Sequence, residues 1–145
     1  MRNVSTKAAT VFHQYIGGTL RGAVKVPPHS CYFNAYSVCP NTKVLIPSEA
    51  GVPTYLELHG NLIARRDWHG KVEINLAGYP TPTTSDRLRA VVRKFGLTIS
   101  KMGGRYYLWR GGLPFPLPDD GWVTVMLPDD HPDRRQLTQP ELIPA

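Results

Sequence analysis

The sequence predicts an α+β fold: an antiparallel sheet of about four to five strands, covered on one face by a single amphipathic helix. Three observations lead to this prediction, namely two segments with hairpin signals, a helical apolar stripe between them, and prolines that interrupt the chain on either side. The expected order of the core elements is strand, strand, helix, strand, strand, strand. With 145 residues the chain has the length of one ordinary domain, so we expect a single domain over residues 1–145.

Prolines divide the chain into three parts. Residues 1–53 carry five prolines, each of which fixes φ and removes a ladder donor, so this part is expected to form strands and loops and no helix. Residues 113–118 alternate apolar residues with proline, which favours polyproline II geometry and an extended path across the core. Residues 128–145 contain four prolines and almost no periodicity, and we expect an extended C-terminal tail. The core is therefore placed at residues 54–127.

The first element of this core is a predicted β-hairpin. Residues 56–64 alternate as one imperfect strand, in which Gly60 and Asn61 indicate a bulge or kink. Residues 72–76 alternate cleanly as the second strand. Between the two strands, Asp67 can open a turn and Gly70 can take the left-handed conformation that closes it.

A helix is predicted to follow a turn-rich bridge over residues 77–85, whose final hydroxyl-bearing residues can cap it. Gly96 is the expected C-terminal cap. Apolar residues at i, i+3, i+4 and i+7 form the face that should meet the core: Leu88, Val91, Val92 and Phe95.

The charges on this helix are uneven. Arg93 and Lys94 complement the negative end of the helix dipole, but Arg87 and Arg89 lie in the first turns, where the dipole disfavours cations. We therefore expect an interaction outside the helix to require Arg87 and Arg89.

A second hairpin is predicted over residues 97–110, because Gly103 and Gly104 separate two alternating runs and both can adopt positive φ. In its second strand one face carries Arg105, Tyr107 and Trp109, and the other carries Tyr106, Leu108 and Arg110. Whichever face meets the helix, the other presents aromatic rings together with a cation. Residues 123–127 indicate one further strand.

Positive charge is concentrated in the middle of the chain. Ten Lys or Arg residues and three Asp or Glu residues lie between Leu58 and Gly111, whereas residues 112–145 carry a net charge of −4. Eleven of the seventeen basic residues are arginines, which favours planar recognition of phosphate or carboxylate over diffuse attraction. An ordinary arginine-rich surface without a partner is the alternative interpretation.

Two segments resemble a pattern found in small bacteriophage-encoded proteins of unassigned function. The first is His59–Asp67 (HGxxIARRD) and the second is Ala77–Leu88 (AGYxTxTTxxRL). The resemblance implies a phage accessory or host-takeover protein. It implies no catalytic residue, and it leaves the proline-rich flanks unassigned.

No motif in the sequence predicts an enzyme. His29, Cys31 and Cys39 lack the CxxC spacing of a zinc site, and packing is the expected role of the two thiols. The acids are dispersed in turns, and no nucleophile elbow, phosphate loop or dinucleotide fingerprint is present. No stretch is long and apolar enough to span a membrane, and no signal peptide begins the chain. We therefore expect a cytoplasmic protein, in the host cell if phage-encoded, without metal or cofactor.

The sequence favours a binding function, with nucleic acid or a host nucleoprotein complex as partner. Guanidinium groups can pair with phosphates while exposed rings stack on unpaired bases. The same residues suit a protein interface, so an inhibitor or adaptor that docks on a host defence complex is the alternative, and a virion or assembly component is the third hypothesis. The predicted contact residues are Arg65, Arg66, Arg87, Arg89, Arg93, Lys94, Arg105, Tyr107, Trp109 and Arg110.

Overall fold

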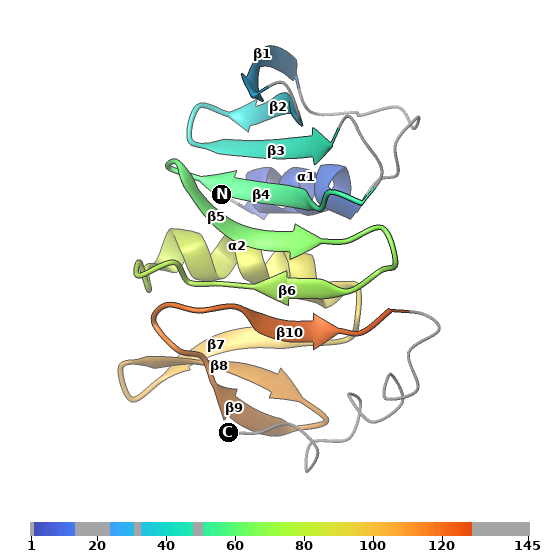
Figure 1. Cartoon of the computed structure of the whole chain (residues 1–145). Coiled ribbons are helices and arrows are strands. Elements are labelled where there is room, and N and C mark those ends of the chain that lie inside the picture. Colours follow the sequence, from blue (N-terminus) through green and yellow to red (C-terminus); the bar gives the residue numbers. More distant parts are fainter. Residues whose placement is uncertain (1, 14–23, 31–32, 48–50, 129–145) are drawn as a thin grey trace.

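The computed structural model describes residues 2–13, 24–30, 33–47 and 51–128, and confirms the α+β class (Figure 1). The side chains of residues 2, 3 and 24–30 are not described. The elements, in chain order, are α1 (Arg2–His13), β1 (Val24–Ser30), β2 (Phe33–Cys39), β3 (Thr42–Pro47), β4 (Thr54–Leu58), β5 (Asn61–Arg66), β6 (Val72–Ile74), α2 (Pro82–Arg93), β7 (Thr98–Met102), β8 (Arg105–Arg110), β9 (Leu113–Pro116) and β10 (Val123–Met126).

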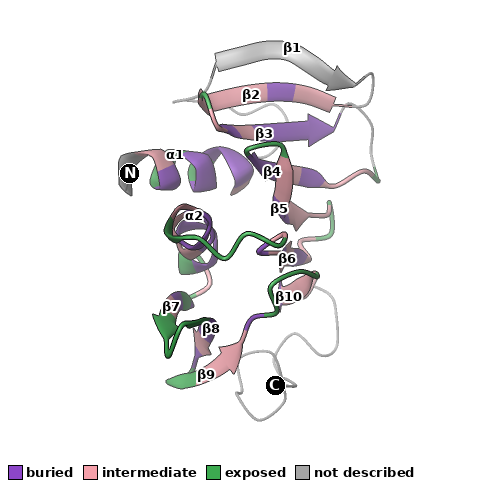
Figure 2. Ribbon diagram, turned by 90° about the vertical axis from the view of Figure 1, so that its left-hand side faces the viewer, coloured by how far each residue is buried: buried purple, intermediate pink, exposed green. Residues whose placement is uncertain are grey.

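The strands form two antiparallel sheets. The large sheet has seven strands in the order β1-β2-β3-β4-β5-β6-β10, and the small sheet has three in the order β7-β8-β9. Both helices lie on the same side of the large sheet. The small sheet lies at one end of the space between the helices and the large sheet (Figure 2). The core fills this space with fully buried side chains from every layer, among them Phe12 of α1, Leu56 of β4, Leu88 of α2 and Leu108 of β8.

The helix α1 corrects the expectation that residues 1–53 contain no helix. Ala8, Val11 and Phe12 recur at i, i+3 and i+4 and are completely buried. A 12-residue helix is marginal alone, so burial of Val11 and Phe12, worth about 1.5–3 kcal/mol each, is what holds it in place. The prediction of strands is confirmed for residues 24–30, 33–39 and 42–47.

The single kinked strand predicted over residues 56–64 is two strands. His59 and Gly60, with φ of 51° and 82°, form a tight turn, and β4 pairs with β5 across it. The bulge or kink predicted at Gly60 and Asn61 is therefore a turn. A bulge that was not predicted lies at Ile63, where Leu56 pairs with Ala64 and Glu57 with Leu62. The next hairpin is confirmed: Gly70 N donates to the carbonyl oxygen of Asp67 at 3.1 Å, and β5 pairs with β6.

The predicted helix and its glycine stop are confirmed, but the helix begins earlier than expected, because residues 82–85 of the predicted bridge form its first turn. Thr81 Oγ1 accepts a hydrogen bond from Thr84 N, as an N-cap does, and the helix starts at Pro82. At the other end Leu97 N donates to the carbonyl oxygen of Val92, while Gly96 has a φ of 75°. This is the bonding pattern of a glycine-terminated helix.

The small sheet confirms the second hairpin and corrects the assignment of residues 113–118. Those residues contain an edge strand, β9, which pairs with β8 and does not lie across the core as polyproline II. Leu117 N donates to the carbonyl oxygen of Tyr106, so by alternation the ring nitrogens of Pro114 and Pro116 point away from β8, where no donor is needed. The final predicted strand is β10, which joins the large sheet beside β6. The predicted tail, beyond Pro128, lies outside the described residues.

Candidate functional site

The structure separates the predicted contact residues into several places. Arg87 and Arg110 are buried, with 2% and 3% of their surface exposed. Arg65 lies on the face of the large sheet opposite the helices, whereas Arg66 faces them. The remaining residues lie on α2 or on the small sheet: Arg89, Arg93, Lys94, Arg105, Tyr107 and Trp109.

Arg87 holds α1, α2 and β3 together. Its Nη1 donates to Ser5 Oγ at 2.6 Å and its Nε donates to Thr42 Oγ1 at 3.1 Å. Ser5 Oγ in turn donates to Asp86, which lies 3.8 Å from Arg87 Nη1. This network explains why an arginine occurs in the first turns of the helix, where the helix dipole disfavours a cation. It also buries Arg87, which therefore has no access to a partner. The prediction of a partner contact is wrong for this residue.

The prediction of a partner contact is also corrected for Arg110. Its Nη2 donates to the carbonyl oxygen of Val125 on β10, which links the two sheets, and burial lowers the pKa of its guanidinium. Arg89 is partly exposed, but its Nε donates to the carbonyl oxygen of Ile99 at 2.7 Å. Because β7 is an edge strand, this bond covers part of its open edge.

Three predicted cations meet at the C-terminal ends of the two helices. Arg66 donates from Nε and Nη2 to the carbonyl oxygen of Phe12, one of the carbonyls that α1 leaves unpaired. Arg93 and Lys94 are exposed and line a groove of about 410 Å³ between α1 and α2, together with His13. Burial, and then the charges of Lys94 and Arg66, lower the pKa of His13 to about 4, although its bond to the carbonyl of Val91 opposes the shift.

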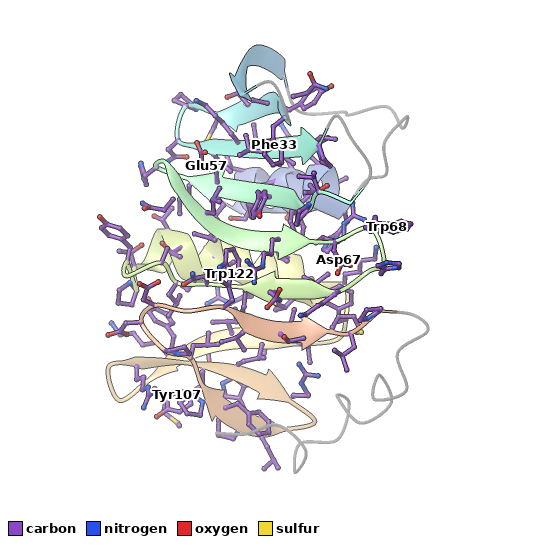
Figure 3. The ribbon with its side chains drawn as sticks, in the orientation of Figure 1. Phe33, Glu57, Asp67, Trp68, Tyr107 and Trp122 are labelled. Carbon is purple, nitrogen blue, oxygen red and sulfur yellow. The ribbon has the colours of Figure 1, made fainter. Side chains whose placement is uncertain are left out.

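Arg65 lies on the other side of the large sheet. Its Nε donates to Glu73 Oε1 at 2.9 Å, and its guanidinium stacks 4.1 Å from the centre of the Trp122 ring. Figure 3 shows Trp122 on the sheet face turned away from the helices. The charge of Arg65 is therefore partly neutralised, and it is separated from the cations at the helix ends by the thickness of the sheet.

The outer face of the small sheet carries the remaining predicted residues. Tyr106, Leu108 and Arg110 face the core, so the alternate residues of β8 face outward: Arg105, Tyr107 and Trp109. Arg105 is exposed and the two aromatic residues are half-buried. Figure 3 places Tyr107 at the end of the molecule opposite Phe33. Trp109 Nε1 is buried without a hydrogen-bond partner in the described part of the chain, so the exposed part of its ring is carbon surface.

The strand register adds residues that the sequence did not single out. On this outer face Trp109 lies opposite Thr98 and Pro114, and Tyr107 lies opposite Ser100 and Pro116. Met102, with 47% of its surface exposed, lies opposite Arg105. The prolines could have been assigned to this face only if β9 had been recognised as a strand. We define the outer face as Thr98, Ser100, Met102, Arg105, Tyr107, Trp109, Pro114 and Pro116, none of which is acidic.

Metal ligands, free thiols and membrane-spanning helices bear on the kind of partner that the protein can bind. Within the described residues, no three His, Cys, Asp or Glu side chains come together as metal ligands. His29 and Cys31 are outside the side chains that are described, and Cys39 is a free thiol whose Sγ donates to Asn41 Oδ1. Neither of the two described helices could cross a bilayer.

One comparison with known proteins gives a match. Residues 34–111, just over half of the chain, match the family model described as Kyanoviridae Gp96 protein. The matched segment contains every residue predicted to contact a partner, but neither α1 nor β10. No curated protein and no solved structure is matched.

Proposed function

The chain belongs to the Kyanoviridae Gp96 protein family, and we propose that this phage protein binds nucleic acid or a nucleoprotein complex through the outer face of its small sheet. The observation that carries the proposal is that Arg105, Tyr107 and Trp109 share one solvent-facing side of β8, with no acidic residue beside them on that face. We also propose that the protein acts by binding its partner and catalyses no reaction.

The chemistry of the outer face fits unpaired nucleotides. Half-exposed rings offer stacking surfaces that accept any base, and an arginine can pair with the adjoining phosphate. Arg93 and Lys94 line the groove between α1 and α2, so they are not part of this face. Arg87 and Arg110 contribute to the fold and have no place in this interface.

Binding of the full chain to labelled single-stranded DNA and RNA tests the proposal, measured by fluorescence anisotropy at several salt concentrations. Tyr107→Ala should weaken binding by about 5- to 150-fold, the range of one stacked base. Arg105→Gln should lower the salt slope by about 1, since one phosphate contact is lost. Lys7→Gln, which removes an exposed cation on α1, is the control and should change the affinity little. If Tyr107→Ala binds nucleic acid as tightly as the wild type does, the outer face is not the binding site.

A host protein is the second candidate partner, because two apolar side chains are exposed at the ends of this sheet. Met102 and Leu113 have 47% and 51% of their surface exposed, and methionine is common in interfaces. A pull-down from host lysate, with and without nuclease, separates the two partners. Retention of one protein after nuclease, lost in Met102→Ser, would favour the protein partner over nucleic acid.

A further inference from the structure

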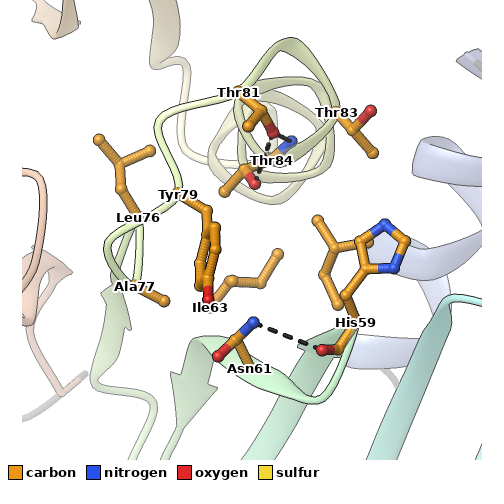
Figure 4. Close-up of a pocket in the computed structure, with 10 residues that line it drawn as sticks. His59, Asn61, Ile63, Leu76, Ala77, Tyr79, Thr81, Thr83 and Thr84 are labelled. Atoms are coloured by element: carbon orange, nitrogen blue, oxygen red, sulfur yellow. Dashed lines mark hydrogen bonds between the residues drawn. The ribbon is translucent and has the colours of Figure 1, made fainter.

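A pocket of about 380 Å³ lies at the opposite end of α2 from Arg93 and Lys94 (Figure 4). It is enclosed by the β4–β5 turn, the bridge between β6 and α2, and the first turn of α2. The two segments that resemble phage proteins, residues 59–67 and 77–88, thus meet here, although their first residues are 18 positions apart. Its volume lies within the usual range of small-molecule sites, about 300–1,000 Å³.

Both turns that flank the pocket have a non-glycine residue in the left-handed region. His59 has a φ of 51° and Ala77 a φ of 57°, and they are the non-glycine residues with positive φ in the described chain. His59 N donates to the carbonyl oxygen of Asn41, and Ala77 N donates to Asn75 Oδ1 at 2.7 Å. The surrounding structure therefore holds both walls of the pocket in unfavourable backbone conformations, which concentrate at functional sites.

The lining combines an apolar floor with polar groups and contains no Asp, Glu, Lys or Arg side chain. Leu58, Ile63 and Leu76 are almost completely buried and form the floor. Thr81 and Thr84 bond to each other at 3.0 Å between their hydroxyl oxygens. In the described part of the chain the side-chain hydroxyls of Tyr79 and Thr83 bond to no other residue, so both remain free for a ligand.

Two rings and one amide define the kind of ligand. In Figure 4 the rings of Tyr79 and His59 stand on opposite sides of the pocket, with Asn61 below them. Asn61 Nδ2 makes a long 3.4 Å contact to the carbonyl oxygen of His59, so its amide retains both donor and acceptor capacity. Proteins recognise a flat ring with hydrogen-bonding edges by stacking on an aromatic side chain and by amide contacts to the edge of the ring.

We infer that this pocket binds a nucleobase stacked on the ring of Tyr79, with His59 across the pocket and Asn61 and Thr83 at the edge of the base. The lack of a lysine or arginine in the lining places any phosphate outside the pocket. The base can come from a free nucleoside or nucleotide, or from a base turned out of a nucleic-acid strand. This site is separate from the outer face of the small sheet, so either site can exist without the other.

The test is NMR titration of the ¹⁵N-labelled full chain with adenosine, guanosine, cytidine and uridine, and then with short single-stranded oligonucleotides. Amide shifts should move at residues 59–61 and 77–84 with at least one probe. Tyr79→Ala should weaken this binding by about 5- to 150-fold, the loss expected for one stacked base. Trp68→Ala is the matched control, because Trp68 is 60% exposed and Tyr79 is 57% exposed, yet Trp68 lies on the β5–β6 turn outside the pocket.

The outcomes separate the sources of the base. Pocket shifts with nucleosides assign a free ligand, and pocket shifts with oligonucleotides alone assign a base in a strand. Asn61→Leu should change the order of preference among the four bases without changing the fold, which thermal unfolding checks. The inference is overturned if no probe moves the pocket amides, or if Tyr79→Ala binds as the wild type does. Neither result affects the Tyr107→Ala test of the outer face.

Discussion

The contact between α1 and α2 and the outer face of the small sheet draw on the same arginine-rich stretch of sequence and use it in opposite ways. At the helix contact, Arg87 is 2% exposed and its nitrogens bond to Ser5 and Thr42. On the outer face, Arg105 is exposed beside Tyr107 and no carboxylate lies on that face. A run of positive charge therefore contains both residues that hold the fold and residues available to a partner, and burial separates them.

The largest effect is expected for Arg87→Met, which keeps the bulk of the side chain but leaves Ser5, Asp86 and Thr42 without their shared donor. We expect the free energy of unfolding to fall by about 2–4 kcal/mol, because hydrogen bonds to a buried charged group are lost. Urea unfolding measures the change. Arg93→Met, on the exposed side of the same helix, is the control, and equal losses in the two variants would remove the distinction between the regions.

The second largest effect is a dependence of the free energy of unfolding on pH, caused by His13 at the contact between α1 and α2. His13 has a pKa lowered to about 4 in the folded chain, because burial disfavours its charged form. In the unfolded chain the pKa of His13 is near the usual histidine value of 6.5, so below that pH the unfolded chain binds protons that the folded chain does not. The free energy of unfolding should therefore fall between pH 6.5 and about 4, by at most about 3 kcal/mol.

Urea unfolding at several pH values, compared with His13→Gln, isolates this contribution from that of the carboxylates. The stability of the variant should vary less across the same window. Identical pH profiles would mean that burial beside Phe12 and Phe95 does not hold His13 neutral.

A smaller effect is expected for Arg66→Gln. The variant loses the two hydrogen bonds to the carbonyl oxygen of Phe12 and the favourable charge at the C-terminal end of α1. We expect a loss of about 1–2 kcal/mol, with faster amide hydrogen exchange in the last turn of α1 than in α2. Unchanged exchange in α1 would show that packing alone fixes the end of this helix.

The smallest effect on stability is expected on the outer face. Arg105→Gln should change the free energy of unfolding by less than about 0.5 kcal/mol, because the side chain is exposed. The same variant should reduce nucleic-acid binding. A large loss of stability would mean that Arg105 belongs with Arg87 among the residues that hold the fold.

Turns and helix ends could be predicted from the sequence, because their stability depends on interactions between neighbouring residues. The turn at Asp67, the helix stop at Gly96 and the hairpin at Gly103 each depend on residues a few positions apart, and each is present as predicted. A hydroxyl N-cap is also present, but at Thr81, four residues before the end of the predicted bridge. The helix α1 was missed because the prolines that argued against a helix begin only at residue 27, after the helix has ended. Its buried stripe also contains alanines and Ser5, which look polar or neutral in the sequence. It is stable only because α2 and β3 cover that stripe.

The residues of the candidate site could likewise be predicted only where they depend on neighbouring residues. Alternation along β8 placed Arg105, Tyr107 and Trp109 on one face, and the structure has that face outward. Nothing local to Arg87 could show that Ser5, 82 residues away, accepts its hydrogen bond. The pocket between His59 and Tyr79 likewise depends on how β5 and α2 pack, so no single segment predicts it.

The sequence alone determined the α+β class, the helix α2, the two predicted hairpin turns and the division of β8 into two faces, because periodicity and turn chemistry act over a few residues. Only the tertiary structure decided which arginines are buried, that β9 completes a second sheet, and that two distant turns enclose one pocket. Those outcomes depend on contacts between residues far apart in the chain, and burial is a property of the packed molecule and of no segment within it.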